Sequence, residues 1–138
     1  EIKSQFPEYV SCDLNEILKE SDIVSFHCKP NPDGSSIINA KEIRIMKKNV
    51  LIINTARGNL VSEIDLYDAI KNYNIGGVAL DVFAEEPANN NILFGLENVL
   101  LTPHIAASTA EAQIIVAEMI ANQFVDYFLD NKINNSVI

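Results

Sequence analysis

The sequence has few cysteines, few basic residues and no long apolar run. Its two cysteines, Cys12 and Cys28, form no CxxC pair, which argues against a disulfide framework or a zinc site and favours a reducing, cytoplasmic compartment. Only 10 Lys and Arg residues stand against 19 Asp and Glu, so nucleic acid is not the expected partner. No apolar run approaches the roughly 18 residues of a membrane span, and the first residues lack the apolar core of a signal peptide. A membrane partner is therefore not expected either.

The composition instead indicates a globular α/β domain. The chain has 138 residues, of which 48% are hydrophobic, enough for one domain with a sizeable core. Short apolar runs alternate with helical patterns, which predicts a three-layer parallel sheet with flanking helices. Continuous apolar runs such as Val50 to Ile53 fit strands covered on both faces. The expected strands are 9–10, 23–27, 50–54, 77–81 and 99–101.

Helix starts are marked by capping side chains followed three residues later by an acid. Asp13, Asn39 and Ser108 precede a glutamate in this way, and Ser62 precedes an aspartate. The expected helices are 13–20, 39–47, 62–72 and 108–131. The last helix has an apolar stripe at helical spacing, which we interpret as core-facing: Ile115, Met119, Ile120, Phe124, Tyr127 and Phe128. Two long loops, 29–36 and 83–97, are candidates for function.

Polar groups follow four of the expected strands. They are His27, Arg57, Asp81 and His104, with Glu86 close behind Asp81. In an open parallel sheet, ligands bind outside the carboxyl ends of the strands. The pattern therefore predicts an active site at this edge of the sheet.

Each of these groups has a structural and a functional interpretation. Arg57 can grip a carboxylate with two parallel hydrogen bonds or serve equally well in a structural ion pair. An acid that closes a strand, as Asp81 does, is commonly a cap or turn former. Glu85 and Glu86 can be a solvated pair, but Glu86 and His104 can also form an acid/base pair. No hydrolase elbow, phosphate loop or metal-ligand spacing is present, so a catalytic metal is not expected.

Four motifs, in this order and spacing, resemble the D-isomer-specific 2-hydroxyacid dehydrogenases. They are SDIVSFH (21–27), IINTARG (52–58), ALDVFAEEP (79–87) and LTPH (101–104). Within that family, the motifs resemble the 3-phosphoglycerate dehydrogenase branch in particular, which serves serine biosynthesis. The resemblance implies a Rossmann-type domain, NAD as cofactor, a small 2-hydroxy or 2-oxo acid as substrate and a homodimer of the full-length protein.

The resemblance also implies roles for individual residues. The catalytic residues would be Arg57, which binds the substrate carboxylate, His104, which exchanges a proton with the substrate oxygen, and Glu86, which assists His104. Asp81 would help to hold the nicotinamide amide. The full set of expected cofactor-binding residues is His27, Cys28, Thr55, Ala56, Arg57, Asp81, His104, Ile105, Ala106 and Ala107.

The chain departs from the family pattern in several places. It contains no GxGxxG segment and no upstream acid for the adenosine ribose, and nothing in it could supply a separate substrate-binding domain. Lys29 stands where many members have proline, and Ala106 and Ala107 where many have glycine. We therefore interpret residues 1–138 as the carboxyl-terminal portion of an NAD-binding domain, inactive on its own.

Two alternatives remain at this point. The chain can be an NAD-sensing or protein-interaction module of the same fold without catalysis. It can also be an unrelated flavodoxin-like or response-regulator-like domain, which would need an acidic cluster or a flavin loop near the first strands, and the sequence shows neither.

Overall fold

The computed structural model describes residues 9–72 and 74–136. The chain divides into two units, one extending to His104 and the other beginning at Ile105. None of the helices in the described ranges has both the length and the apolar character needed to cross a membrane.

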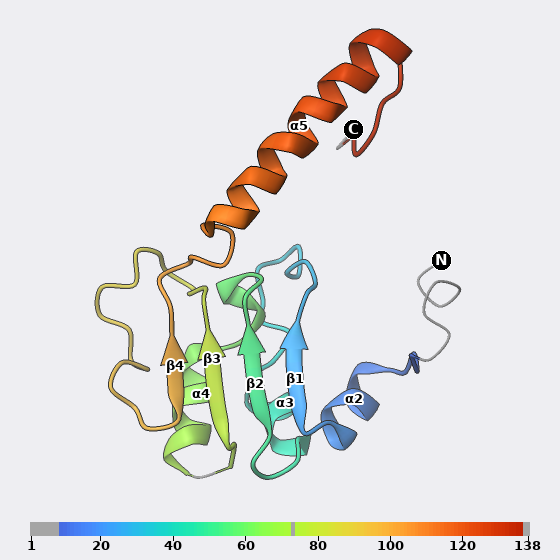
Figure 1. Cartoon of the computed structure of the whole chain (residues 1–138). Helices are drawn as coiled ribbons and strands as arrows, with labels where there is room; N and C mark the ends of the chain where they lie inside the picture. Colours follow the sequence, from blue (N-terminus) through green and yellow to red (C-terminus); the bar gives the residue numbers. More distant parts are fainter. Residues whose placement is uncertain (1–8, 73, 137–138) are drawn as a thin grey trace. The chain divides into compact units, whose positions relative to one another are not determined.

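The first unit is built on a four-stranded parallel sheet (Figure 1). Its strands are β1 (Ile23–Phe26), β2 (Leu51–Asn54), β3 (Gly77–Leu80) and β4 (Val99–Leu101). They lie in the order β1-β2-β3-β4, so among the described strands each one pairs only with its neighbours in the sequence. This confirms the α/β class, the parallel sheet and four of the expected strands.

Helices alternate with the first three strands. Helix α2 (Leu14–Glu20) precedes β1, α3 (Ala40–Ile45) joins β1 to β2, and the short 3-10 helix η1 (Gly58–Leu60) and α4 (Glu63–Lys71) join β2 to β3. The connection from β3 to β4 is an irregular loop, and so is segment 29–36, as expected.

The predicted caps of α2, α3 and α4 are present. The Asp13 side chain accepts a hydrogen bond from the backbone N–H of Glu16 at 2.9 Å. Asn39 forms a full capping box, and the Ser62 side chain accepts from the backbone of Asp65 at 3.4 Å. These caps satisfy free donors at the helix starts, which explains why the sequence indicated the starts well.

The hydrophobic core lies on one face of the sheet. Alternate strand residues, including Val24, Ile52 and Leu80, are buried with helix residues such as Leu18 and Leu66. In Figure 1, α3 and α4 lie on this face. Residues on the other face remain exposed: Ile23, Leu51 and Leu100. Within this unit, the expected cover on both faces is therefore present on one face only.

The expected strand at Tyr9 and Val10 is wrong. These two residues have no strand conformation and are 62% and 86% exposed. A strand is stabilised by pairing with a neighbour, and β1 pairs with β2 alone among the described strands. Aromatic and β-branched side chains alone are therefore not enough to form a strand at these two positions.

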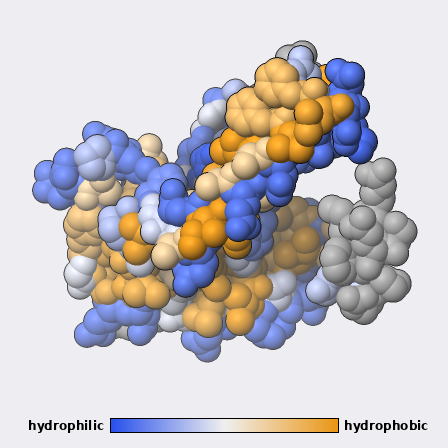
Figure 2. All heavy atoms as spheres, turned by 45° about the horizontal axis from the view of Figure 1, so that its top comes forward, coloured by the Kyte–Doolittle hydropathy of each residue, from blue (hydrophilic) through white to orange (hydrophobic). Residues whose placement is uncertain are grey.

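The second unit contains the long helix α5 (Ala110–Asp130). Its cap is Thr109, whose side chain accepts from the backbone of Ala112 at 3.1 Å, and not the expected Ser108. None of its residues is buried, so the expected core-facing stripe is wrong for the described residues. Figure 2 shows apolar side chains on the surface of this helix. The helical period was correct, but periodicity does not show whether a covering surface exists.

Candidate active site

The four strands end at the same level of the sheet. Phe26, Asn54, Leu80 and Leu101 form the last paired row, so the next residue of each strand stands at the same edge. Two backbone hydrogen bonds extend the row, from Asp81 N–H to the Asn54 carbonyl and from Thr102 N–H to the Leu80 carbonyl, both 3.0 Å. The parallel register thus gathers His27, Thr55, Asp81 and Thr102 along one edge.

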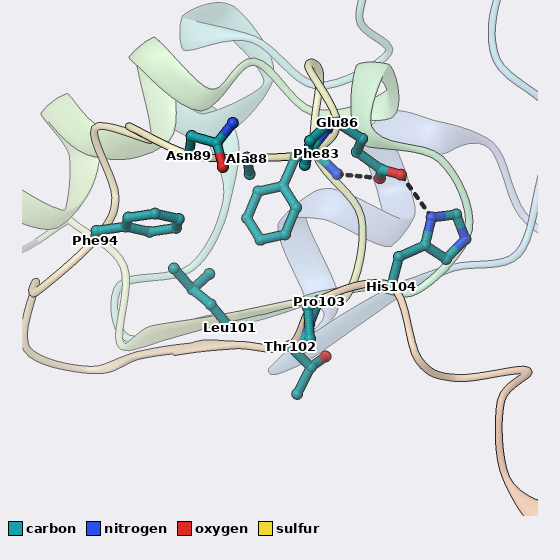
Figure 3. Close-up of a pocket in the computed structure, with 10 residues that line it drawn as sticks. Phe83, Glu86, Ala88, Asn89, Phe94, Leu101, Thr102, Pro103 and His104 are labelled. Carbon is teal, nitrogen blue, oxygen red and sulfur yellow. Dashed lines mark hydrogen bonds and ion pairs between the residues drawn. The ribbon is translucent and has the colours of Figure 1, made fainter.

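Glu86 and His104 form a direct pair. Glu86 Oε2 lies 2.7 Å from His104 Nδ1, and Glu86 Oε1 accepts the backbone N–H of Phe83 at 2.9 Å. Figure 3 shows both contacts, with the second ring nitrogen of His104 facing away from Glu86. The sequence predicted this pair, and the structure brings its members together across 18 residues.

His104 has an unusual backbone conformation. Its φ is +53°, in the left-handed region that few residues other than glycine adopt, although histidine visits it more often than most. Its N–H donates to the Thr102 carbonyl at 3.0 Å, which closes a tight turn after β4. Such a conformation costs free energy and is commonly found at functional sites.

The surroundings of Glu86 favour its charged form. The hydrogen bond with His104, and then the one from the Phe83 N–H, hold the pKa of Glu86 below its ordinary value. Both side chains are accessible, with 49% of His104 and 35% of Glu86 exposed. A carboxylate on Nδ1 orients the ring and leaves Nε2 as the atom that can exchange a proton with a bound molecule.

A buried asparagine organises the turn after β2. Asn54 is 1% exposed; its Nδ2 donates to the Arg57 carbonyl at 2.8 Å and its Oδ1 accepts from the Ala56 N–H at 3.1 Å. Arg57 itself is exposed and donates to the Ala56 carbonyl at 2.6 Å. Sequence reasoning missed Asn54, although a polar residue that ends an apolar strand was a signal for it.

The end of β3 is linked to the end of β4. Asp81 is 4% exposed and accepts the Thr102 hydroxyl hydrogen at 2.5 Å. The carboxylate is therefore held at the sheet edge by a residue that sequence reasoning had not singled out, although it belongs to the LTPH motif. A buried carboxylate requires such hydrogen bonds.

The remaining predicted cofactor residues are placed as follows. His27 is exposed at the end of β1, and its Nε2 lies 2.9 Å from the Ser25 hydroxyl. Cys28 is exposed with a free thiol. Residues 105–107 belong to the second unit, where the Ser108 N–H donates to the Ile105 carbonyl at 2.9 Å.

A cavity of about 610 Å³ lies beside Glu86 and His104. Its walls are mainly apolar, and Phe83 and Phe94 meet edge to face with ring centroids 6.3 Å apart. Figure 3 shows Phe83, Phe94 and Leu101 together on one side of Glu86. The acid/base pair thus borders an apolar hollow.

This fold and these motifs define a family. Residues 2–106 match the D-isomer specific 2-hydroxyacid dehydrogenase, NAD binding domain, and the chain belongs to this family. The resemblance inferred from the motifs, the Rossmann-type fold and NAD as the family's cofactor are confirmed.

Individual relatives include several dehydrogenases. The chain is 44% identical over 126 residues to D-3-phosphoglycerate dehydrogenase of Methanocaldococcus jannaschii, covering 88% of this chain and 24% of that protein. It is 39% identical over 135 residues to glycerate dehydrogenase of Methylorubrum extorquens, covering 96% and 43%.

A solved structure has a similar fold. An acyclic imino acid reductase in complex with NADPH and D-Arg is 35% identical, with a TM-score of 0.81 over 92% of this chain and 40% of that one. The chain thus spans between 24% and 43% of these three proteins.

Proposed function

We propose that residues 1–138 are the carboxyl-terminal portion of the NAD-binding domain of an NAD-dependent oxidoreductase. The whole protein would interconvert D-2-hydroxy acids and 2-oxo acids such as the 3-phosphoglycerate pair, as a cytoplasmic homodimer serving serine biosynthesis. The hydrogen-bonded Glu86 and His104 pair at the sheet edge is the observation that carries this proposal.

The pair would perform the proton transfer. Glu86 occupies Nδ1 of His104 and the second ring nitrogen faces away from it, so Nε2 would be the atom that meets a substrate oxygen. When a 2-oxo acid is reduced, His104 would donate its Nε2 proton to that oxygen, and the carboxylate of Glu86 would keep the ring oriented for this transfer. In the oxidising direction Nε2 receives the proton instead.

The cofactor would supply the hydride, and the sheet edge suits its binding. A nicotinamide amide needs a fixed hydrogen-bond acceptor, and the buried Asp81 carboxylate, held by Thr102, has that character. The other proposed cofactor residues are His27, Cys28, Thr55, Ala56, Arg57, His104, Ile105, Ala106 and Ala107. Positioning of the reactants by these groups contributes to the rate.

Arg57 would bind the substrate carboxylate. Its guanidinium is exposed, and the hydrogen bond to the Ala56 carbonyl uses one of its five donors. Asn54 fixes the turn that carries it, so the charge is presented from a rigid support.

The experiment uses the natural protein that carries this sequence. NADH binding and NADH-dependent reduction of 2-oxo acids are measured for the parent, Arg57→Ala, His104→Gln and the control Glu85→Gln. We expect His104→Gln to lower kcat by about 10²–10⁴-fold, Arg57→Ala to raise KM for the oxo acid, and the control to match the parent.

Two outcomes would contradict the proposal. Oxo acid reduction that is unchanged in both Arg57→Ala and His104→Gln would exclude the assigned roles. A parent protein that binds NADH but reduces no 2-oxo acid would support the sensing module instead.

A further inference from the structure

Glu63, the first residue of α4, contacts the loop that carries Glu86. Its Oε1 accepts the backbone N–H of Ala84 at 2.8 Å, and its Oε2 accepts from Asn91 Nδ2 at 2.7 Å. Both carboxylate oxygens thus bind a loop that lies 21 and 28 residues further along the chain. A helix cap alone does not explain this arrangement, because Ser62 already caps α4.

The loop between β3 and β4 is organised around two carboxylates. Successive backbone donors go to different acids, the Phe83 N–H to Glu86 and the Ala84 N–H to Glu63. The backbone at Phe83 and Ala84, where the chain turns toward Glu86, is therefore held by one carboxylate of the loop and by one of α4. Bonds from N–H groups to charged carboxylates are shorter and stronger than neutral ones.

The contact with Asn91 fixes the far arm of the same loop. Asn91 donates to Glu63, and its Oδ1 accepts the backbone N–H of Leu93 at 3.0 Å. Leu93 is fully buried in the core. Glu63 thus joins the start and the far arm of the loop through a chain that is anchored in the core.

Glu63 itself is held in place. It is partly buried in the first turn of α4, where the helix dipole favours a negative charge. The backbone at Gly58, just before this helix, packs so closely on the Phe83 carbonyl that a Cβ there would lie 1.9 Å from it. The loop therefore rests on a support with little freedom to move.

We propose that Glu63 is a positioning residue for the Glu86 and His104 pair, acting through the Ala84 N–H. This inference rests on the proposed function of that pair. Glu63 touches neither His104 nor the proton that moves; it fixes the backbone from which Glu86 reaches the ring. A misplacement of about 1 Å in such a site can cost 10²-fold in rate.

The experiment compares Glu63 variants in two backgrounds of the natural protein. Glu63→Ala and Glu63→Gln are assayed for kcat, for the Kd of NADH and for thermal unfolding, each in the parent and in Glu86→Gln. Glu85→Gln is the matched control, because it also removes one negative charge, from an exposed side chain in the loop that Glu63 contacts.

We expect Glu63→Ala to lower kcat about tenfold or more in the parent while the Kd of NADH stays unchanged. Glu63→Gln should lower kcat less, because its amide oxygen can still accept the Ala84 N–H. Glutamine also keeps the volume of the glutamate side chain, so this variant still tests the proposal if Glu63→Ala does not fold. In the Glu86→Gln background, neither change should lower kcat further, because a residue that acts through Glu86 has nothing left to position.

Three outcomes would overturn the inference. An equal loss of kcat in both backgrounds would show a general structural role, and a parent-like kcat in both Glu63 variants would show no role. If Glu86→Gln alone keeps the parent kcat, the proposed acid/base pair is refuted, and the role of Glu63 with it. The last result is visible before any Glu63 variant is made, so the two failures are distinguishable.

Discussion

Replacing Gly58 by alanine tests whether the backbone contact below the active-site loop is as close as the structure shows. A Cβ at this position would lie 1.9 Å from both the carbonyl carbon and the oxygen of Phe83, and 2.5 Å from the Ala84 nitrogen. An ordinary contact begins at 3.4 Å, so the two backbone segments must separate by about 1.5 Å. All three neighbours are backbone atoms, which cannot turn away as a side chain can.

The free energy cost follows from this geometry. Extra volume in a well-packed site costs about 1–3 kcal/mol, and a backbone clash belongs at the upper end of that range. A movement of about 1.5 Å at Phe83 would also stretch the 2.9 Å hydrogen bond from its N–H to Glu86. A contact of 3.6 Å or more is no longer a hydrogen bond, so this bond would be lost. Gly58→Ala should therefore lower both stability and, in the natural protein, kcat.

Two other glycines provide a graded comparison. A Cβ at Gly76 would lie 2.4 Å from the Asn49 carbonyl oxygen, and one at Gly77 would lie 3.1 Å from the Asn98 oxygen. Urea unfolding of the three alanine variants, followed by circular dichroism, should give the largest loss at Gly58 and the smallest at Gly77. Equal midpoints for Gly58→Ala and Gly77→Ala would refute the reasoning.

Three further predictions concern hydrogen bonds at the sheet edge. Thr102→Val removes a donor from the buried Asp81 and should destabilise the fold by about 1–3 kcal/mol in urea titrations, whereas Thr102→Ser should match the parent. Asn54→Ala removes two bonds from the turn before Arg57; it should lower stability by a similar amount, about 1–3 kcal/mol, and raise KM for the oxo acid in kinetic assays. Folding lowers the pKa of Glu86, so its carboxylate stabilises the fold at pH values above 4.5, the ordinary pKa of glutamate. The difference in urea midpoint between the parent and Glu86→Gln should therefore shrink as the pH falls below 4.5. A gap that widens on acidification would contradict the last prediction.

Much of the first unit was predictable because its signals are local. The run from Val50 to Ile53 indicated a strand, and Asp13 and Asn39 marked helix starts through bonds to residues two or three positions away. Such patterns depend on the chain's own neighbours, so one sequence suffices. The prediction of a strand at Tyr9 and Val10 was wrong because strand formation also depends on a neighbouring strand, which a local pattern does not reveal.

In the candidate site, too, features with a local sequence signal were predicted and features that depend on distant contacts were missed. The Glu86 and His104 pair could be predicted because both belong to motifs at the ends of neighbouring strands. The supports of that site were missed: Asn54 and Glu63 act through contacts that depend on the exact path of a turn or a loop. No periodicity or spacing encodes such a path.

The strand order also has a consequence for how the site forms during synthesis. Because β1, β2, β3 and β4 pair strictly in sequence order, each new strand can add to the edge that the preceding one leaves, and pairings between sequence neighbours form quickly. His104 follows the last of these strands and is therefore the last of the three proposed catalytic residues to leave the ribosome. A nascent chain can fold the sheet that holds Arg57 and Glu86 before it contains the group that transfers the proton.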